Sequence, residues 1–290
     1  MTIASQLSSE TNAVSEKGKM PVVEYSENQN IYAQAAHDLY AGLKHWRLWT
    51  LLAWNDLYQR YKRTWIGMGW IALSFALFAL VKIFIFGPMT GKSLSFYGPY
   101  LAVGFLSFRL ISNFISNGAN VYVGAQSWIK SEPLPLSVHL YKLLTSNFII
   151  FGFMTVPSVL ICLFFGVSDP LVLAVLPFAL ITYALNGVWL SSLIGIMCAR
   201  HRDLMHFVTT IMQVLYFATP ILWVAPETGI RATLANINPL THFIAILREP
   251  VLKSTIPWDS WKLMGIYTIV GLTISFLVFA QSRKRLIYWL

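Results

Sequence analysis

Six long runs of apolar residues follow one another along the chain, separated by short polar or basic stretches. They cover residues of about 66–86, 99–123, 138–165, 170–198, 204–224 and 262–281. A helix needs about 20 mostly apolar residues to cross a bilayer, and inside lipid it must pair its own backbone polar groups. The pattern therefore predicts an all-α integral membrane protein with six transmembrane helices.

The composition supports this class. Only 11% of the residues are charged, against about 25% in an ordinary soluble domain, which is too few to cover a soluble globule. Cys162 and Cys198 both fall inside apolar runs, so we interpret them as packing residues and predict neither a disulfide nor a metal site. His201 and His206 are five residues apart and do not share a helical face, so they are not expected to bind a metal.

The net charge of +9 suggests nucleic-acid binding at first, but the distribution of the basic residues argues against such a partner. Most of them fall in alternate connections between the apolar runs. They lie at Lys44, Arg47, Arg60, Lys62 and Arg63, at Lys130, at Arg200 and Arg202, and at Arg283, Lys284 and Arg285. With six spans these clusters lie on one side of the membrane, and the positive-inside rule then places both termini in the cytoplasm.

The polar residues 1–35 are predicted to form a disordered cytosolic arm, and residues 36–290 the transmembrane domain. Residues 36–63 place Leu39, Leu43, Trp46, Ala53 and Leu57 on one helical face. This pattern predicts an amphipathic helix that lies along the cytosolic membrane surface. The alternative is a helix whose apolar face packs against other protein.

Residues 87–93 read GPMTGKS and superficially resemble a phosphate-binding loop. That loop needs four residues between its glycines before Lys-Ser/Thr, and here only three separate Gly87 from Gly91. The stretch also falls on the predicted outer side, away from cytosolic ATP. We interpret it as a turn that leaves span one, a role that suits Pro88 and Gly91. Any ATP-driven work would then need a partner subunit.

One charged residue breaks the regular apolar pattern. Arg109 lies well inside an apolar run. An ionisable side chain is costly there, which makes Arg109 a candidate functional residue; the alternative is that it snorkels or pairs with a carbonyl.

The segment before the last span also departs from the pattern. Residues 225–260 are too few for a folded domain but long enough for one or two short helices, with a break at Asn238-Pro239. A re-entrant helical hairpin that dips in from the outer side fits this segment.

Three short motifs, in order along the chain, resemble the membrane subunit of type-2 ABC exporters, in particular the polysaccharide and O-antigen export permeases. The first is Arg60-Tyr61-Lys62-Arg63-Thr64-Trp65-Ile66-Gly67 with Trp70. The second is Arg202-Asp203-Leu204, followed by Gln213 and Thr219-Pro220-Ile221-Leu222-Trp223. The third is Asn238-Pro239-Leu240-Thr241 with Arg248. Each motif alone is weak, but three in register are strong, and the resemblance extends over about residues 36–290.

The resemblance implies a homodimer of six-helix subunits in the bacterial cytoplasmic (inner) membrane, with two cytosolic ABC ATPase subunits that bind ATP and Mg. No cofactor is expected in this chain. The implied cargo is a lipid-linked glycan, such as one carried on undecaprenyl diphosphate, and spans one, two and five would line its channel. The re-entrant helices would close the outer end, with Asn238, Pro239, Phe243 and Arg248 as gate residues.

Residue chemistry agrees with such a cargo. A glycan presents hydroxyls and apolar CH faces, which suit aromatic and dispersed polar side chains. The candidate channel-lining residues are Trp70, Tyr100, Phe105, Phe108, Arg109, Asn113 and Tyr122. The alternative is that the serines and asparagines of span two hold helices together.

Basic residues at the cytosolic side supply two further candidate sites. Arg60, Lys62 and Arg63 are candidates for gripping a pyrophosphate at the cytosolic headgroup level, although ordinary positive-inside anchoring explains each of them as well. The short cytosolic connections are candidates for ATPase coupling, through Lys130, Glu132, Arg200, Arg202 and Asp203.

Two other functions stay open at this point. A type-2 ABC pump for drugs or small lipids would share the fold. An integral-membrane glycosyl- or acyltransferase is a more distant alternative, because it needs paired carboxylates or His/Asp groups near one membrane face. Four of the twelve acidic residues lie in the N-terminal arm and the others are scattered, so the sequence favours a transport permease over an enzyme.

Overall fold

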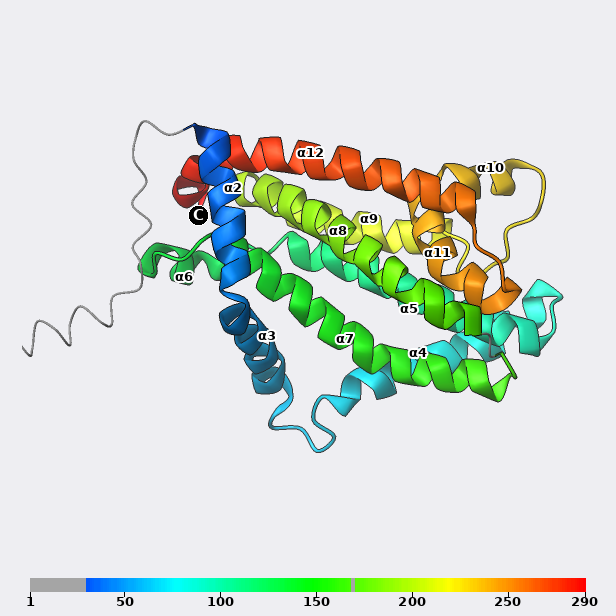
Figure 1. The fold of residues 1–290 in the computed structure, drawn as a ribbon. Helices are drawn as coiled ribbons and strands as arrows, with labels where there is room; N and C mark the ends of the chain where they lie inside the picture. The colour runs from blue at the N-terminus through cyan, green and yellow to red at the C-terminus, as the bar shows by residue number, and fades with distance from the viewer. Residues whose placement is uncertain (1–29, 168–169) are drawn as a thin grey trace, which may run out of the picture.

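The computed structural model describes residues 30–167 and 170–290, and within them every regular element is helical (Figure 1). The longer helices are α2 (Ile31–Lys44), α3 (Trp46–Tyr61), α4 (Gly69–Phe86), α5 (Leu94–Gly118), α7 (Ser137–Phe164), α8 (Pro170–Arg200), α9 (Leu204–Ala218), α11 (Pro239–Lys253) and α12 (Trp258–Trp289). The short elements are α6 (Gln126–Ser131), α10 (Ile230–Ile237) and the 3₁₀ turns η1 (Pro88–Thr90) and η2 (Val123–Ala125). The prediction of an all-α chain is confirmed for this part of the protein.

Among the described residues, five helices are long and apolar enough to cross a membrane: α4, α5, α7, α8 and α12. The fifth predicted span, 204–224, is shorter than expected, because α9 ends after 15 residues at Ala218. Thr219 is extended (ψ 139°), as the residue before a proline prefers to be. Residues 219–224 therefore continue from α9 as irregular chain.

The N-terminal boundary also differs from the sequence prediction. Helix α2 starts at Ile31, inside the predicted arm 1–35, because Asn30 caps it by accepting a hydrogen bond from the Tyr32 amide. The predicted single helix 36–63 is two helices. They separate at His45, whose amide bonds back to the Gly42 carbonyl (3.1 Å), and the Trp49 indole donates to the same carbonyl (3.2 Å). The rest of the predicted arm, residues 1–29, lies outside the described residues.

Two other predicted spans have different ends. The span predicted at 99–123 is α5, which begins five residues earlier because the Ser93 hydroxyl caps it. It ends at Gly118, which packs so close to Ser191 that a Cβ there would lie 2.7 Å from the Ser191 Cα. The span predicted at 262–281 is α12, which continues as a helix to Trp289.

The connections between the helices agree better with the sequence-based predictions than the helix ends do. GPMTGKS forms the turn between α4 and α5, with Gly91 in the left-handed conformation (φ 66°), which confirms the prediction of a turn. Residues 225–260 contain the two helices α10 and α11, which agrees with the prediction of one or two short helices, and Asn238 caps α11. Glu132 is extended after α6, and residues 133–135 have no regular structure before α7.

Helix α5 is the centre of the bundle. Its first half is almost completely buried, and it packs against α4, α7, α8, α9 and α11. Figure 1 shows α2, α6 and the C-terminus gathered at one end of the bundle, and α10 and α11 at the other. We call these the α2 end and the α11 end. The second half of α5 turns polar side chains towards a cavity, which is the most distinctive feature of the molecule.

Candidate transport cavity

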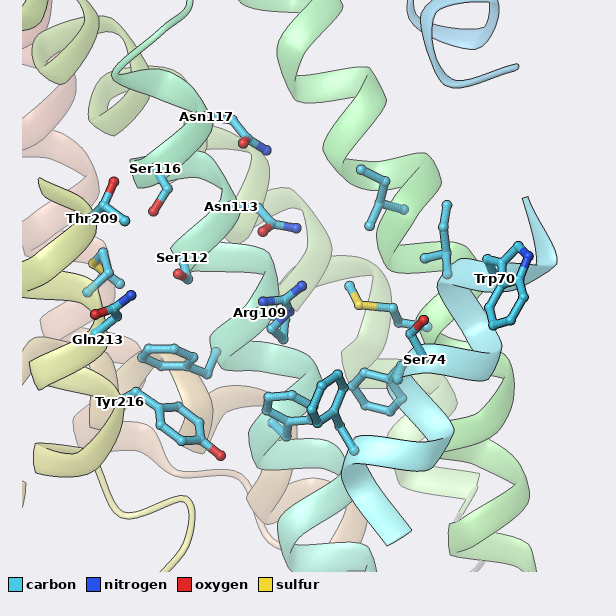
Figure 2. A pocket seen from close by; sticks show the side chains of 18 of the residues that line it. Trp70, Ser74, Arg109, Ser112, Asn113, Ser116, Asn117, Thr209, Gln213 and Tyr216 are labelled. Atoms are coloured by element: carbon cyan, nitrogen blue, oxygen red, sulfur yellow. The ribbon is translucent and has the colours of Figure 1, made fainter. Parts of the chain in front are cut away.

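A cavity of about 730 Å³ opens beside the second half of α5 (Figure 2). Its walls come from α3, α4, α5, α7 and α9. The lining residues are Arg60, Tyr61, Trp70, Ile71, Ser74, Phe75, Phe78, Lys82, Phe105, Phe108, Arg109, Ser112, Asn113, Ser116, Asn117, Ile150, Met154, Thr209, Met212, Gln213, Tyr216 and Phe217. We call this the central cavity. It combines aromatic rings with amides, hydroxyls and cationic groups.

The polar side of the central cavity is one face of α5. Arg109, Ser112, Asn113, Ser116 and Asn117 recur at intervals of three and four residues, which places them on one helical face. Figure 2 shows this column running along α5, opposite Thr209, Gln213 and Tyr216 of α9. Such a face is costly towards lipid, and here it borders a cavity instead.

Arg109 is exposed although its neighbours Phe108 and Leu110 are both buried. Its side chain extends from α5 into the space between α4 and α9 (Figure 2). Neither a hydrogen bond nor an ion pair holds it within the described part of the chain. The structure thus favours a cavity-facing Arg109 over one paired with a backbone carbonyl.

A second cavity, of about 510 Å³, continues towards the α2 end between α3, α5, α6 and α7. We call it the end cavity. Arg60, Ser116, Asn117 and Ile150 line both cavities, so the two spaces adjoin along the polar face of α5. Together they form one polar path from the α2 end into the middle of the helical bundle.

The end cavity is lined mainly by polar groups. Asn117 Nδ2 donates to Asn147 Oδ1 (2.9 Å), while Asn147 is 1% exposed and its own Nδ2 has no partner among the described residues. Lys142 of α7 forms an ion pair with Asp56 of α3 across the mouth of this cavity. A buried amide donor without a partner is costly, and it is available for a polar ligand.

The structure divides the predicted channel residues into two groups. Trp70, Phe105, Phe108, Arg109 and Asn113 line the central cavity. Tyr100 and Tyr122, also predicted to line the channel, do not line this cavity. Their exposed fractions are 5% and 0%, because Tyr100 turns towards the α11 end and Tyr122 lies in the bend after α5, packed in a second core cluster.

The predicted entry residues also separate. Arg60 lines both cavities, whereas Lys62 and Arg63 are exposed and line neither. The break after Tyr61 explains this, because Lys62 and Arg63 follow the last turn of α3. Of these three basic residues, only Arg60 therefore faces the polar path.

At the α11 end, the predicted gate residues contact the irregular chain that follows α9. Arg248 Nη1 donates to the Pro220 carbonyl (2.7 Å), and its guanidinium lies 4.1 Å from the centre of the Tyr100 ring. Asn238 Nδ2 donates to the Thr219 hydroxyl (2.9 Å). Carbonyls after a helix end need such partners. Motifs that lie far apart in the sequence thus meet here.

Three tyrosines complete this network. Tyr100 Oη donates to the carbonyls of Pro220 (3.0 Å) and Trp223 (3.2 Å), and Tyr97 Oη donates to that of Leu222 (2.7 Å). Tyr183 Oη donates to the Phe243 carbonyl (2.6 Å), with Phe243 itself 3% exposed. Pro239 is the first residue of α11. We call this set of contacts the Arg248 network.

The candidate coupling residues gather at the α2 end. Lys130 and Glu132 are exposed around the end of α6, and Asp203 is exposed before α9. Arg200 lies over the Trp289 ring (5.6 Å), and Arg202 Nη2 donates to the Leu290 carbonyl (3.4 Å). The turn before α9 is therefore held against the C-terminal residues.

Next to this surface lies a buried ionic joint, which we call the Asp38 joint. Asp38 accepts hydrogen bonds from the amides of Leu136 (3.3 Å) and Ser137 (3.1 Å), and from the Ser137 hydroxyl (2.8 Å). Arg283 Nε donates to the same carboxylate (3.1 Å). Asp38 is 1% exposed. The joint connects α2, the proline segment before α7 and the end of α12.

Comparison with known protein families identifies the family to which this chain belongs. The sequence profile of the ABC-2 type transporter family matches residues 47–252, which include α4, α5 and α9 and most of the lining of both cavities. The chain belongs to the ABC-2 type transporter family. Its family is one of transport permeases, as the three motifs suggested.

Among the curated relatives of this ABC-2 permease is the O-antigen export system permease protein RfbA of Klebsiella pneumoniae. It is 25% identical over 232 residues, which cover 76% of this chain and 87% of the relative. The protein of the same name from Myxococcus xanthus is 20% identical over 240 residues, which cover 81% and 92% of the two chains.

Sequence reasoning missed several lining residues of this permease. Lys82, Ser74 and Thr209 line the central cavity without belonging to a motif, and Asn147 and Lys142 line the end cavity. The spacing of polar residues along α5 could have identified the cavity-facing side of that helix. Lys82 stands alone near the end of an apolar run, and no spacing marks it as different from an interfacial anchor.

Proposed function

We propose that this chain is the membrane permease of an ABC exporter that moves a lipid-linked O-antigen, or a similar cell-surface glycan, across the bacterial inner membrane. The observation that carries the proposal is the continuous polar path along α5, lined by amides, hydroxyls and aromatic rings. Amides and hydroxyls match the hydroxyls of a sugar, and the rings match its apolar CH faces. The names of the relatives support the same cargo class.

We propose that the chain crosses the membrane six times and has both termini in the cytoplasm. The fifth crossing along the chain is α9, continued by the irregular residues 219–224. Fifteen helical residues span only about 22 Å, and the irregular residues after them would supply the remaining length. Irregular chain at membrane depth is tolerated where protein satisfies its polar groups, which is what the Arg248 network does for these carbonyls.

We propose that two copies of the permease associate through α9. Only Met212 of this helix is buried, and Phe207, Ile211, Val214 and Phe217 are 60%, 38%, 60% and 66% exposed. These four recur at helical spacing beside the cavity-lining residues of the same helix. A second copy packed on this stripe would close the open side of the central cavity.

Energy would come from two partner ATPase subunits that bind ATP and Mg at the α2 end. The exposed Lys130, Glu132, Arg202 and Asp203 form the proposed docking surface. Cysteines introduced at positions 130 and 202 are expected to cross-link to the ATPase. Labelling of either cysteine from outside intact cells would contradict both the docking and the topology.

The cargo is tested in a glycan-producing strain from which this gene is deleted. We expect loss of surface glycan and accumulation of lipid-linked glycan inside the cell, both restored by the wild-type chain. Asn113→Leu, which removes an amide from the central cavity, should restore much less glycan at equal permease abundance. Normal surface glycan in the deletion strain, together with increased sensitivity to drugs, would instead indicate a type-2 ABC pump.

We also propose that α10 and α11 are re-entrant and that α11 closes the outer end of the path. Asn238, Pro239, Phe243 and Arg248 would then hold the closed state through the irregular chain after α9. Because these contacts form one connected network, loosening any of them is expected to affect opening more than membrane insertion, which depends mainly on cytosolic charges.

A further inference from the structure

The central cavity is strongly unbalanced in charge. Arg60, Lys82 and Arg109 line it, and no aspartate or glutamate among the described residues does. The Asp56 carboxylate lies in the adjoining end cavity, where it pairs with Lys142. Cationic groups inside a membrane protein normally pair with carboxylates or carbonyls. Within the described residues, neither Lys82 nor Arg109 has such a partner.

Aromatic rings surround Lys82 instead. Its Nζ lies 3.5 Å from the centre of the Phe105 ring, 4.9 Å from that of Tyr216 and 5.7 Å from that of Phe78. These rings come from α5, α9 and α4, so the ammonium group bridges three walls of the cavity. Ring faces attract a cation but supply no oxygen acceptor, so the ammonium group can still donate hydrogen bonds to an oxyanion.

We call the rings of Phe78, Phe105 and Tyr216 around Lys82 the aromatic cage. Its position along the cavity determines when a moving cargo would reach Lys82. Phe78 and Lys82 lie in the second half of α4 and Tyr216 near the end of α9, which are the parts of the cavity closest to the α11 end. Arg109 lies deeper along α5, and Arg60 at the opposite limit, on α3. A charged group that enters beside Arg60 would meet Arg109 next and Lys82 last.

We propose that Lys82 and Arg109 form a binding site for the diphosphate ester of an anionic lipid-linked cargo, and that the aromatic cage holds Lys82 until the anion reaches it. The proposal rests on the proposed function only in requiring a cargo that carries a phosphate ester. Two cations in a cavity without carboxylates favour a group with two negative charges, since a single carboxylate would leave one cation uncompensated in a poorly solvated space.

Direct binding tests this site. The full-length permease in detergent is titrated with undecaprenyl diphosphate, undecaprenol, inorganic pyrophosphate or phosphatidylglycerol, and bound molecules are counted by native mass spectrometry. Undecaprenyl diphosphate is expected to bind about tenfold or more tightly than undecaprenol, the ratio expected for one charge-assisted hydrogen bond. Pyrophosphate shows whether the free anion suffices, and phosphatidylglycerol shows whether any anionic lipid does.

Two variants of Lys82 and one control variant test whether Lys82 is responsible for binding of the diphosphate. Lys82→Met keeps the length and ring contacts of the side chain without its charge, and should weaken diphosphate binding about tenfold without changing undecaprenol binding. Lys82→Arg should retain most of the affinity. The matched control is Lys92→Met, which removes an exposed lysine of the turn between α4 and α5.

Equal diphosphate affinity in the wild type and Lys82→Met would overturn the proposed site, as would equal binding of phosphatidylglycerol and undecaprenyl diphosphate. Either result could occur while surface glycan still depends on the permease, so this inference can fail without the proposed function. Conversely, normal surface glycan in the deletion strain would contradict the function even if the purified protein binds the diphosphate.

Discussion

Two buried arginines, one at each end of the bundle, are stabilised in different ways. Arg283 at the α2 end and Arg248 at the α11 end are both 7% exposed. Arg283 bonds the Asp38 carboxylate, which also accepts two backbone amides. Arg248 bonds the Pro220 carbonyl and lies over the Tyr100 ring.

The difference indicates what each end can do. A buried ion pair resists separation, because either partner alone is an uncompensated charge, so the Asp38 joint suits a rigid link between α2, the segment before α7 and α12. A bond from a guanidinium to a carbonyl can be exchanged for one to water at lower cost. The Arg248 network therefore suits an end that opens and closes.

The largest expected effect is at the Asp38 joint. Asp38→Ala leaves Arg283 buried without its carboxylate and should destabilise the protein by about 3–5 kcal/mol. The measurements are permease abundance in membranes and the thermal midpoint in detergent. Asp259→Ala is the matched control, since it breaks an exposed pair with Lys262 that contributes about 0–1 kcal/mol.

The double variant Asp38→Ala/Arg283→Met sharpens this prediction. Removing both charges should recover part of the loss, but not all of it, because the amides of Leu136 and Ser137 also lose their acceptor. A double variant less stable than Asp38→Ala would show that the pair is not what makes the single change costly.

The intermediate effect is at the other end. Arg248→Met should cost about 1.5–3 kcal/mol, the usual contribution of a charged hydrogen bond, and should reduce surface glycan while membrane insertion and ATPase co-purification persist. Arg231→Met is its control, because Arg231 is exposed on α10 and its replacement should change stability by no more than about 0.5 kcal/mol. Equal export in the two variants would argue against a gating role.

The sequence predicted the apolar helices and the two helices between residues 225 and 260 well, because apolar length and proline breaks are local signals. It predicted helix ends less well. The early start of α2 depends on the Asn30 cap. The last residue of α5, Gly118, packs against Ser191, which is a contact between distant segments.

The candidate site shows the same limit. Trp70, Arg109 and Asn113 were identified from residue type, and they do line the cavity. Tyr100 and Lys82 could not be placed, because their roles depend on which neighbour the helix rotation brings near. Tyr100 faces the carbonyls after α9, whereas Lys82 faces rings from α5 and α9.

The smallest expected effect is that of Tyr100→Phe, which removes one hydroxyl from the Arg248 network. The Pro220 carbonyl then keeps its bond from Arg248, so the cost should be about 1 kcal/mol or less. In an Arg248→Met background the same change removes the last of these two donors to Pro220, and the cost should rise by at least about 0.5 kcal/mol, as expected for residues that share a partner. Thermal midpoints of the wild type, both single variants and the double variant give this coupling directly. Strictly additive changes would mean that the tyrosine and the arginine stabilise the end of the path independently, and that the network is two separate contacts.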